Sequence, residues 1–333
     1  MARRGEFMAT PSAGTAYRQP ARRRGAACLV CLTRLVAAGM FLLASAPAAR
    51  AQNEEEEGPV VEELTLVTRD KVVLKADYYP GTNNKQTVPV IMLHMYGGSR
   101  QDFAGLAARL QAEGHAVIVP DLRGHGDSTQ REGSTEKLDY TMFKTADFIA
   151  MAGVGGDVEA VKSFLLERHN EGLLNIEALC VVGAEMGATV ALAWSGLDWS
   201  WPVLATGKQG QDVKGLVLLS PVYNFKGLKI TRAIDDPRVR SEVSVYIVVG
   251  KADTKARRDA ERLYKALERY HSKPEKPEDR DLVLNLDMDT KLQGTKLLEE
   301  PTLKLEDRIV NFIRKRLVER NFPWKERRPP LGN

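Results

Sequence analysis

Residues 179–190 constrain the fold of this chain most strongly. They consist of a short apolar run, a turn framed by Gly183 and Gly187 with Glu185 at its tip, and the apolar start of a helix. Glycine on both sides of such a turn lets a helix pass close to the strand that leads into it. A buried strand that runs directly into a helix is typical of sheets with parallel strands.

The rest of the chain repeats this alternation of strand and helix. Near-continuous apolar runs, typical of strands covered on both faces, occur at residues 88–93, 116–119, 178–182, 216–219, 243–249 and 282–284. Apolar residues at helical spacing predict helices around residues 103–110, 158–168, 256–267 and 305–317. Residues 60–66 and 72–79 alternate in polarity and predict an antiparallel pair. We therefore expect an α/β fold with a mostly parallel, eight-stranded sheet and helices on both faces.

The N-terminal 51 residues are typical of a signal peptide. Three consecutive arginines (22–24) precede a mostly apolar run at 35–46, and Ala49-Arg50-Ala51 fits a small-x-small cleavage site. Cleavage before Gln52 predicts a secreted or periplasmic protein; an uncleaved N-terminal anchor is the alternative. The run is short for a membrane span, so none is expected after cleavage. We divide the chain into signal peptide 1–51, acidic spacer 52–59, α/β domain 60–318 and a basic tail 319–333 that is expected to fray.

Charge and cysteine content exclude several classes of function. The net charge is +4, but residues 1–51 carry eight arginines and one glutamate, a charge of +7, which leaves about −3 for the remainder. A mildly acidic mature chain predicts no nucleic-acid partner. Cys180 is the one cysteine that follows the leader, so neither an internal disulfide nor a cysteine metal site is expected there. No dinucleotide or phosphate-binding motif stands in a convincing context, and no cofactor or metal is predicted.

Four further motifs accompany the turn at Glu185, each at the end of a predicted strand. They read LHMYGGSR at 93–100, PDLRGHGDS at 120–128, GKAD at 250–253 and TKLQGTKLL at 290–298. With the turn, they resemble the α/β-hydrolase superfamily, and its serine esterases and lipases in particular, over residues 60–317. The resemblance implies an α/β-hydrolase fold. The insertions at 138–154 and 197–212 are small and are expected over the carboxyl edge of the sheet, and residues 222–240 are too few for a large cap domain.

The resemblance also assigns roles to single residues and leaves the catalytic triad degenerate. Glu185 stands at the nucleophile position, Asp253 at the acid position and Gln293 at the histidine position. The backbone N–H groups of Tyr96 and Met186 stand where the family has its oxyanion donors. His94, His125 and Ser128 are implied to stabilise loops. No histidine follows His271, and the other four precede the turn, so the order of a serine triad cannot be rebuilt.

Two hypotheses follow. In the first, the protein is a secreted pseudoenzyme that binds an unknown small molecule or protein in the cleft, because glutamine cannot act as a general base. In the alternative, it is an active hydrolase of esters, halides or epoxides that uses Glu185 as a carboxylate nucleophile, as haloalkane dehalogenases and epoxide hydrolases use aspartate. An unidentified nucleophile, for instance Ser220 or Asp127, belongs to this alternative. The Glu185 carboxylate is favoured at a helix N-terminus and could fold back onto the oxyanion donors.

Overall fold

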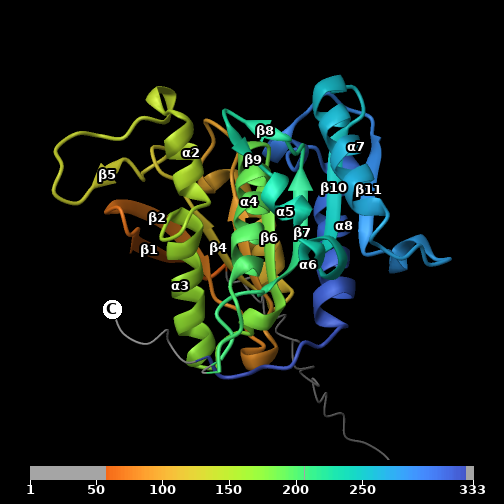
Figure 1. The fold of residues 1–333 in the computed structure, drawn as a ribbon, viewed down its shortest axis with the longest axis horizontal. Helices are drawn as coiled ribbons and strands as arrows, with labels where there is room; N and C mark the ends of the chain where they lie inside the picture. The colour runs from red at the N-terminus through yellow and green to blue at the C-terminus, as the bar shows by residue number, and fades with distance from the viewer. Residues whose placement is uncertain (1–57, 206, 328–333) are drawn as a thin grey trace, which may run out of the picture. The chain divides into compact units, whose positions relative to one another are not determined.

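The computed structural model describes residues 58–205 and 207–327 (Figure 1). The predicted signal peptide and residues 52–57 of the predicted acidic spacer lie outside the described residues. Secretion and leader cleavage therefore stay predictions. No helix of the described ranges is both long and apolar enough to cross a membrane.

The main sheet has eight strands in the order β1-β2-β4-β3-β6-β7-β10-β11, with a two-residue strand, β5 (Gln130–Arg131), paired to β2. The strands are β1 Glu62–Val67, β2 Val72–Tyr79, β3 Pro89–Leu93, β4 Ala116–Pro120, β6 Leu179–Ala184, β7 Val213–Leu219, β10 Ser244–Gly250 and β11 Leu282–Met288. β1, β2 and β4 pair in antiparallel fashion, and every pairing from β4 to β11 is parallel. The predicted antiparallel start and parallel remainder are confirmed.

Helices cover both faces of this sheet, as predicted. One core packs α2, α3, α4 and α7 against the strands, and the other packs α1 and α8 against the opposite face. In Figure 1, α3 and α4 lie in front of the sheet. The helices are α1 Ala104–Ala112, α2 Thr145–Met151, α3 Asp157–Asn170, α4 Met186–Ser200, α5 Thr231–Asp235, α6 Pro237–Glu242, α7 Thr254–Glu268 and α8 Leu305–Ile313, which continues as a π-turn at Arg314–Val318.

The two insertions lie at opposite edges of the sheet, so the prediction for the second one is wrong. Residues 138–154 contain α2 and lie at the carboxyl edge, where the ring of Tyr140 stands 4.9 Å from that of Tyr96. The second insertion begins inside α4, which runs from the end of β6 back along the sheet to Ser200. Residues 201–212 therefore lead into the start of β7, at the amino edge. Trp199 belongs to the helix and donates its indole N–H to the carbonyl of Val213 at 3.0 Å.

The C-terminal tail does not fray over its described part. Arg327 is 6% exposed, and its Nε donates to Oε1 of Glu177 at 2.9 Å. Trp324 donates its indole N–H to the carbonyl of Leu174 at 3.2 Å, and its ring lies 4.9 Å from that of His169. The expectation of a frayed tail is wrong over these residues, because Arg327 pairs with buried acids that are distant in the sequence.

A short hairpin follows β7 at the carboxyl edge of the sheet. Its strands are β8 (Asn224–Phe225) and β9 (Leu228–Lys229), joined by Lys226 and Gly227, which both have positive φ. A two-residue turn with both residues in this region matches the twist of a β-hairpin. Figure 1 shows this hairpin beside the label of α4, at the same end of the sheet as α2. The segment at 222–240 thus holds a hairpin and two short helices, α5 and α6.

Candidate active site

The glycine-framed turn that the sequence predicts has a strained backbone at Glu185. Glu185 has φ 48° and ψ −103°, and it precedes the first residue of α4. A Cβ added at Gly183 would lie 2.5 Å from the carbonyl oxygen of Gly187. A Cβ added at Gly187 would lie 2.1 Å from the carbonyl oxygen of Leu93. Both glycines are therefore required for the strand and the helix to pack so closely. A non-glycine residue in such a conformation costs on the order of 1–3 kcal/mol.

The Glu185 carboxylate faces one of the two predicted oxyanion donors. Burial is the main cause that raises the pKa of this carboxyl group, and the nearby charge of Asp253 raises it further. The backbone N–H of Tyr96 and the charge of Lys255 partly offset that effect, because both favour the ionised form. Met186 is buried and is the first residue of α4, so its N–H has no acceptor within the helix. The Glu185 carboxyl group thus lies at the turn beside the backbone of Tyr96, in surroundings that make its ionisation less favourable.

Asp253, at the predicted acid position after β10, is the N-cap residue of α7. Its Oδ1 accepts hydrogen bonds from the backbone N–H groups of Lys255 and Ala256, each at 3.1 Å. Its Oδ2 is buried and has no partner among the described residues. In a catalytic triad, the acid accepts a hydrogen bond from the histidine. The structure therefore has an unpaired acceptor oxygen on the very carboxyl group that would orient a histidine.

Gln293 does not complete the triad. It is exposed, it follows β11, and it directly precedes the short 3-10 turn Gly294–Leu297. No hydrogen bond of its side chain to a described residue is found. The structure brings Glu185 and Asp253 close enough for their charges to interact, and it leaves the third position without a side chain that could relay a proton.

The histidines near the carboxyl edge have structural roles. His94 is fully buried; its Nε2 accepts from the N–H of Leu122 at 3.0 Å, so its Nδ1 donates to the carbonyl of Met95 at 2.8 Å. Burial lowers the pKa of His94, which keeps the ring neutral. His125 contacts the carbonyl of Arg123 through Nδ1 at 2.9 Å and stacks on Tyr140 with ring centroids 4.2 Å apart. The implied loop-stabilising roles of both histidines agree with these contacts.

The two alternative nucleophiles also have structural contacts. Ser220 is 1% exposed, and its hydroxyl oxygen accepts a hydrogen bond from the N–H of Gly294 at 3.1 Å. Asp127 forms an ion pair of 2.7 Å with Arg100. Both side chains are thus engaged in contacts with other parts of the chain. Among the residues that the structure describes, no group of three His, Cys, Asp or Glu could hold a metal ion.

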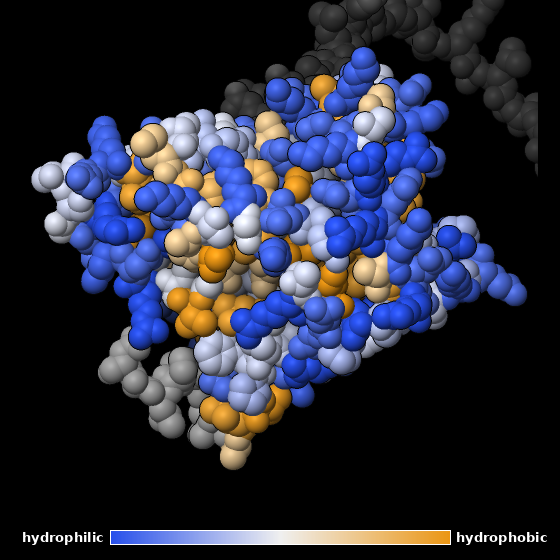
Figure 2. Space-filling model, turned by 45° about the horizontal axis from the view of Figure 1, so that its top comes forward, coloured by the Kyte–Doolittle hydropathy of each residue, from blue (hydrophilic) through white to orange (hydrophobic). Residues whose placement is uncertain are grey.

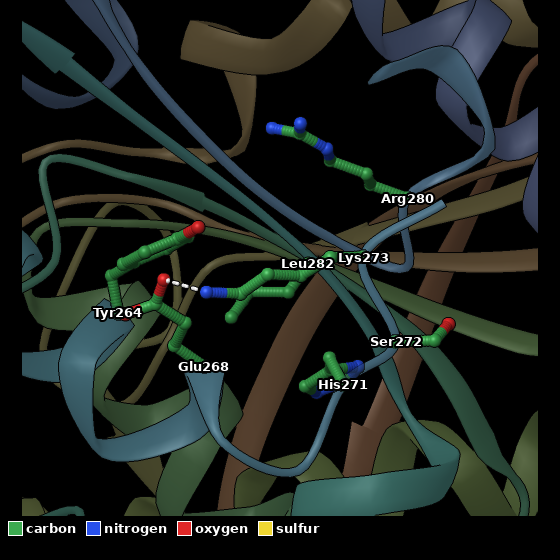
Figure 3. Close-up of a pocket in the computed structure, with 7 residues that line it drawn as sticks. All are labelled: Tyr264, Glu268, His271, Ser272, Lys273, Arg280 and Leu282. Atoms are coloured by element: carbon green, nitrogen blue, oxygen red, sulfur yellow. Dashed lines mark hydrogen bonds and ion pairs between the residues drawn. The ribbon is translucent and has the colours of Figure 1, made fainter. Parts of the chain in front are cut away.

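Two cavities of the protein lie at the amino edge of the sheet, away from Glu185. One, of about 190 Å³, adjoins the start of β11; Figure 3 shows His271 beside it and the ion pair of 2.7 Å between Lys273 and Glu268. The other, of about 260 Å³, is lined by Val88 and Ala178, which precede β3 and β6. His271, the last histidine of the chain, thus lies at the amino edge of the sheet, whereas the predicted triad positions lie at its carboxyl edge.

Aromatic side chains from three segments surround Tyr96 at the carboxyl edge. The ring centroid of Tyr96 lies 4.9 Å from that of Tyr140, 5.5 Å from that of Phe225 and 6.3 Å from that of Phe148. We call Tyr96, Tyr140, Phe148 and Phe225 the aromatic cluster. In Figure 2, which turns the top of Figure 1 forward, apolar surface is interspersed with polar side chains.

Lys226 extends over the aromatic cluster from the turn between β8 and β9. Its ammonium donates to the hydroxyl of Tyr96 at 2.7 Å. Sequence reasoning missed this residue. A glycine after a lysine was the one local signal of the turn, and nothing local indicated the aromatic partners.

The sheet order and the glycine-framed turn define the class of protein as one with the α/β-hydrolase fold. A family model described as alpha/beta hydrolase fold matches residues 88–243. The chain is 17% identical to an esterase from Pyrococcus furiosus (TM-score 0.51; 78% of this chain and 92% of that chain covered) and 15% identical to the esterase Est22 (TM-score 0.54; 77% and 81%). The chain therefore has the α/β-hydrolase fold, and its residues 88–243 match the model of that family.

Two lipases also match a part of the chain. Lipase 3 of Moraxella sp. (strain TA144) is 36% identical over 97 residues, and Lipase 1 of Psychrobacter immobilis is 26% identical over 98 residues. Each match spans 29% of this chain and 29% of the lipase. The similarity to esterases and lipases thus concerns the fold and one segment of the sequence.

Proposed function

We propose that this protein is a secreted, catalytically inactive member of the α/β-hydrolase superfamily that binds a small molecule or a protein partner at the carboxyl edge of its sheet. The Glu185 carboxylate carries the proposal. It stands at the tip of the turn and interacts with the N–H of Tyr96, where the family stabilises negative charge on its substrate. In its ionised form, a carboxylate at this position would repel a developing oxyanion.

The missing base supports the same proposal. Asp253 Oδ2 is buried without a partner, and the exposed Gln293 cannot accept and return a proton. Loss of a triad histidine alone lowers kcat by several orders of magnitude. With neither serine nor histidine, the remaining parts of the site can bind a ligand but lack an activated nucleophile.

Hydrolysis through Glu185 as a carboxylate nucleophile is the second candidate function. One observation favours it, because Glu185 is only partly buried and sits on the strained turn where nucleophiles of this fold are exposed. On an alkyl halide or an epoxide, such a route would form an ester on the Glu185 carboxyl group, with release of halide or opening of the ring. On an aryl ester it would form a mixed anhydride with release of the phenol. Water would then have to be activated to hydrolyse the intermediate. A mass increase on Glu185 after incubation with alkyl halides, epoxides or aryl esters would support this route over the first.

The proposal is tested by hydrolysis of short-chain aryl esters. Protein from Gln52 onward is compared with the Glu185→Ser/Gln293→His double variant and with the Glu185→Ser single variant as its control. We expect no turnover by the wild type, measurable turnover by the double variant, and little by the single variant, which lacks a base. Turnover by the wild type that disappears in Glu185→Ala would overturn the proposal and establish Glu185 as a nucleophile.

A further inference from the structure

The ammonium group of Lys226 occupies an aromatic site at the carboxyl edge. Its Nζ lies 3.9 Å from the ring centroid of Tyr96, 5.3 Å from that of Phe148 and 6.0 Å from that of Phe225. The turn that presents it packs closely on α2, since an added Cβ at Gly227 would lie 2.4 Å from the methyl group of Thr145. Rings from three separate segments of the chain thus converge on one cation.

This arrangement differs from the other contacts between cations and rings in the described ranges. Lysines or arginines lie over rings at several other places, for example Lys85 over Trp324 at 4.0 Å, but each of those cations faces one ring. Lys226 faces three, and no described carboxylate lies within 4.0 Å of its ammonium. The cation is therefore held by ring faces and the hydroxyl of Tyr96 rather than by an ion pair.

An acid lies beside the backbone of one member of the aromatic cluster. Tyr96 offers its ring and hydroxyl to Lys226, while its backbone N–H faces the Glu185 carboxylate. Ring faces attract organic cations through their quadrupoles, and the attraction grows when water is excluded. Aromatic walls with a carboxylate behind them are the surroundings that recognise alkylammonium groups.

We propose that the aromatic cluster is a binding site for an organic ammonium ion, which takes the place of the Lys226 ammonium over Tyr96, Phe148 and Phe225. Lys226 is exposed, so its side chain can leave by rotation of its own torsions while the β8–β9 hairpin stays in place. It acts as an internal competitor that a ligand must displace. This inference rests on the proposed function, because it names the chemical class of the ligand that the carboxyl edge binds.

The test uses choline chloride as the probe and 3,3-dimethylbutan-1-ol, which has the same shape without the charge, as its neutral counterpart. Binding is followed by NMR shifts in protein from Gln52 onward and in the Lys226→Asn variant. Asparagine suits this position because it tolerates the positive φ of 46°. We expect choline to bind Lys226→Asn about tenfold more tightly than the wild type, with the largest shifts at Tyr96 and Phe225, and the neutral alcohol to cause none there.

Matched variants separate the aromatic site from a general loss of charge. Lys85→Asn removes an exposed lysine that lies over one ring, and it should leave choline binding unchanged. In the Lys226→Asn background, Phe225→Leu should weaken binding about tenfold and Glu185→Gln severalfold. Equal shifts with choline and the alcohol, or equal effects of Lys226→Asn and Lys85→Asn, would overturn the proposal. If choline fails to bind as expected and the wild type hydrolyses no ester, only the ammonium site is refuted and the proposed function stands. If the wild type hydrolyses esters, the proposed function is overturned, independently of the choline result.

Discussion

Removal of Arg327 is expected to destabilise the protein strongly, because this residue completes a buried ionic cluster. The cluster joins α3, the end of α4, the loop before β7 and the C-terminal tail. Lys162 lies 2.5 Å from Asp198 and 3.0 Å from Asp212, and Lys208 lies 2.6 Å from Glu177 and 2.9 Å from Asp212. Arg327 pairs with Glu177 and Asp212 and donates to the carbonyl of Lys208. The six members are Lys162, Glu177, Asp198, Lys208, Asp212 and Arg327.

The magnitude follows from the balance of charge. Arg327→Met removes the cation that pairs with both Glu177 and Asp212, so these buried carboxylates lose part of their compensating charge. Breaking a buried ion pair by removal of one partner costs about 3–5 kcal/mol. For a domain of this size, 1 kcal/mol corresponds to a change in Tm of about 2–4 °C, so Tm should fall by roughly 6–20 °C. Methionine retains the apolar stem and removes the charge and the donors.

Thermal and urea unfolding check this prediction against Arg257→Met. Arg257 forms a pair of 2.9 Å with Glu261, and both side chains are more than one third exposed. Loss of such a surface pair should change the free energy of unfolding by less than about 1 kcal/mol. If both variants unfold alike, the tail does not dock into the cluster in solution, and the reasoning from buried charge fails.

Three further predictions concern single residues near the sheet. Burial raises the pKa of Glu185, so Glu185→Gln should raise Tm at pH 7, and the gain should vanish as the pH falls below 4.5; equal melts at both pH values would contradict this. Burial lowers the pKa of His115 from 6.5 to about 4, so the wild type should lose about 3 kcal/mol of stability between pH 6.5 and 4, a loss that His115→Leu should abolish in urea titrations. Gly187→Ala would place a Cβ 2.1 Å from the carbonyl of Leu93 and should cost at least ~3 kcal/mol or prevent soluble expression, whereas Gly105→Ala, with 3.5 Å to its nearest neighbour, should be neutral or stabilising.

The sequence predicts the sheet well because each buried strand is a continuous apolar run. The mostly parallel pairing and the helices on both faces then follow from the alternation of elements and from the resemblance. The turn at Glu185 was predictable because two glycines at fixed spacing are a steric requirement of the backbone. Asp253 was predictable as a helix cap for a similar reason, since a capping acid must directly precede its helix.

The residues that the sequence did not reveal act through distant partners. Lys226 reaches Tyr96 across 130 positions, and Arg327 reaches Glu177 across 150. No local pattern records such contacts. The prediction that residues 197–212 lie over the carboxyl edge was wrong for a different reason. Trp199 and Ser200 were assigned to a loop, but α4 stays apolar and helical through 15 residues, which carries the loop to the opposite edge of the sheet.

The intact turn at Glu185 is evidence for the fold and not for catalysis. Backbone groups hold it: the N–H of Glu185 donates to the carbonyl of Leu219 at 2.8 Å, and the N–H of Thr189 donates to the carbonyl of Glu185 at 3.2 Å. None of these contacts involves the side chain at the tip, so the backbone conformation of the turn persists whatever residue stands there. Function must therefore be inferred from the groups around the tip. These are a carboxylate at an oxyanion donor, an acid with an unpaired buried oxygen, and an ammonium group over three rings. These groups are the basis on which we propose the binding of a cation rather than the cleavage of an ester.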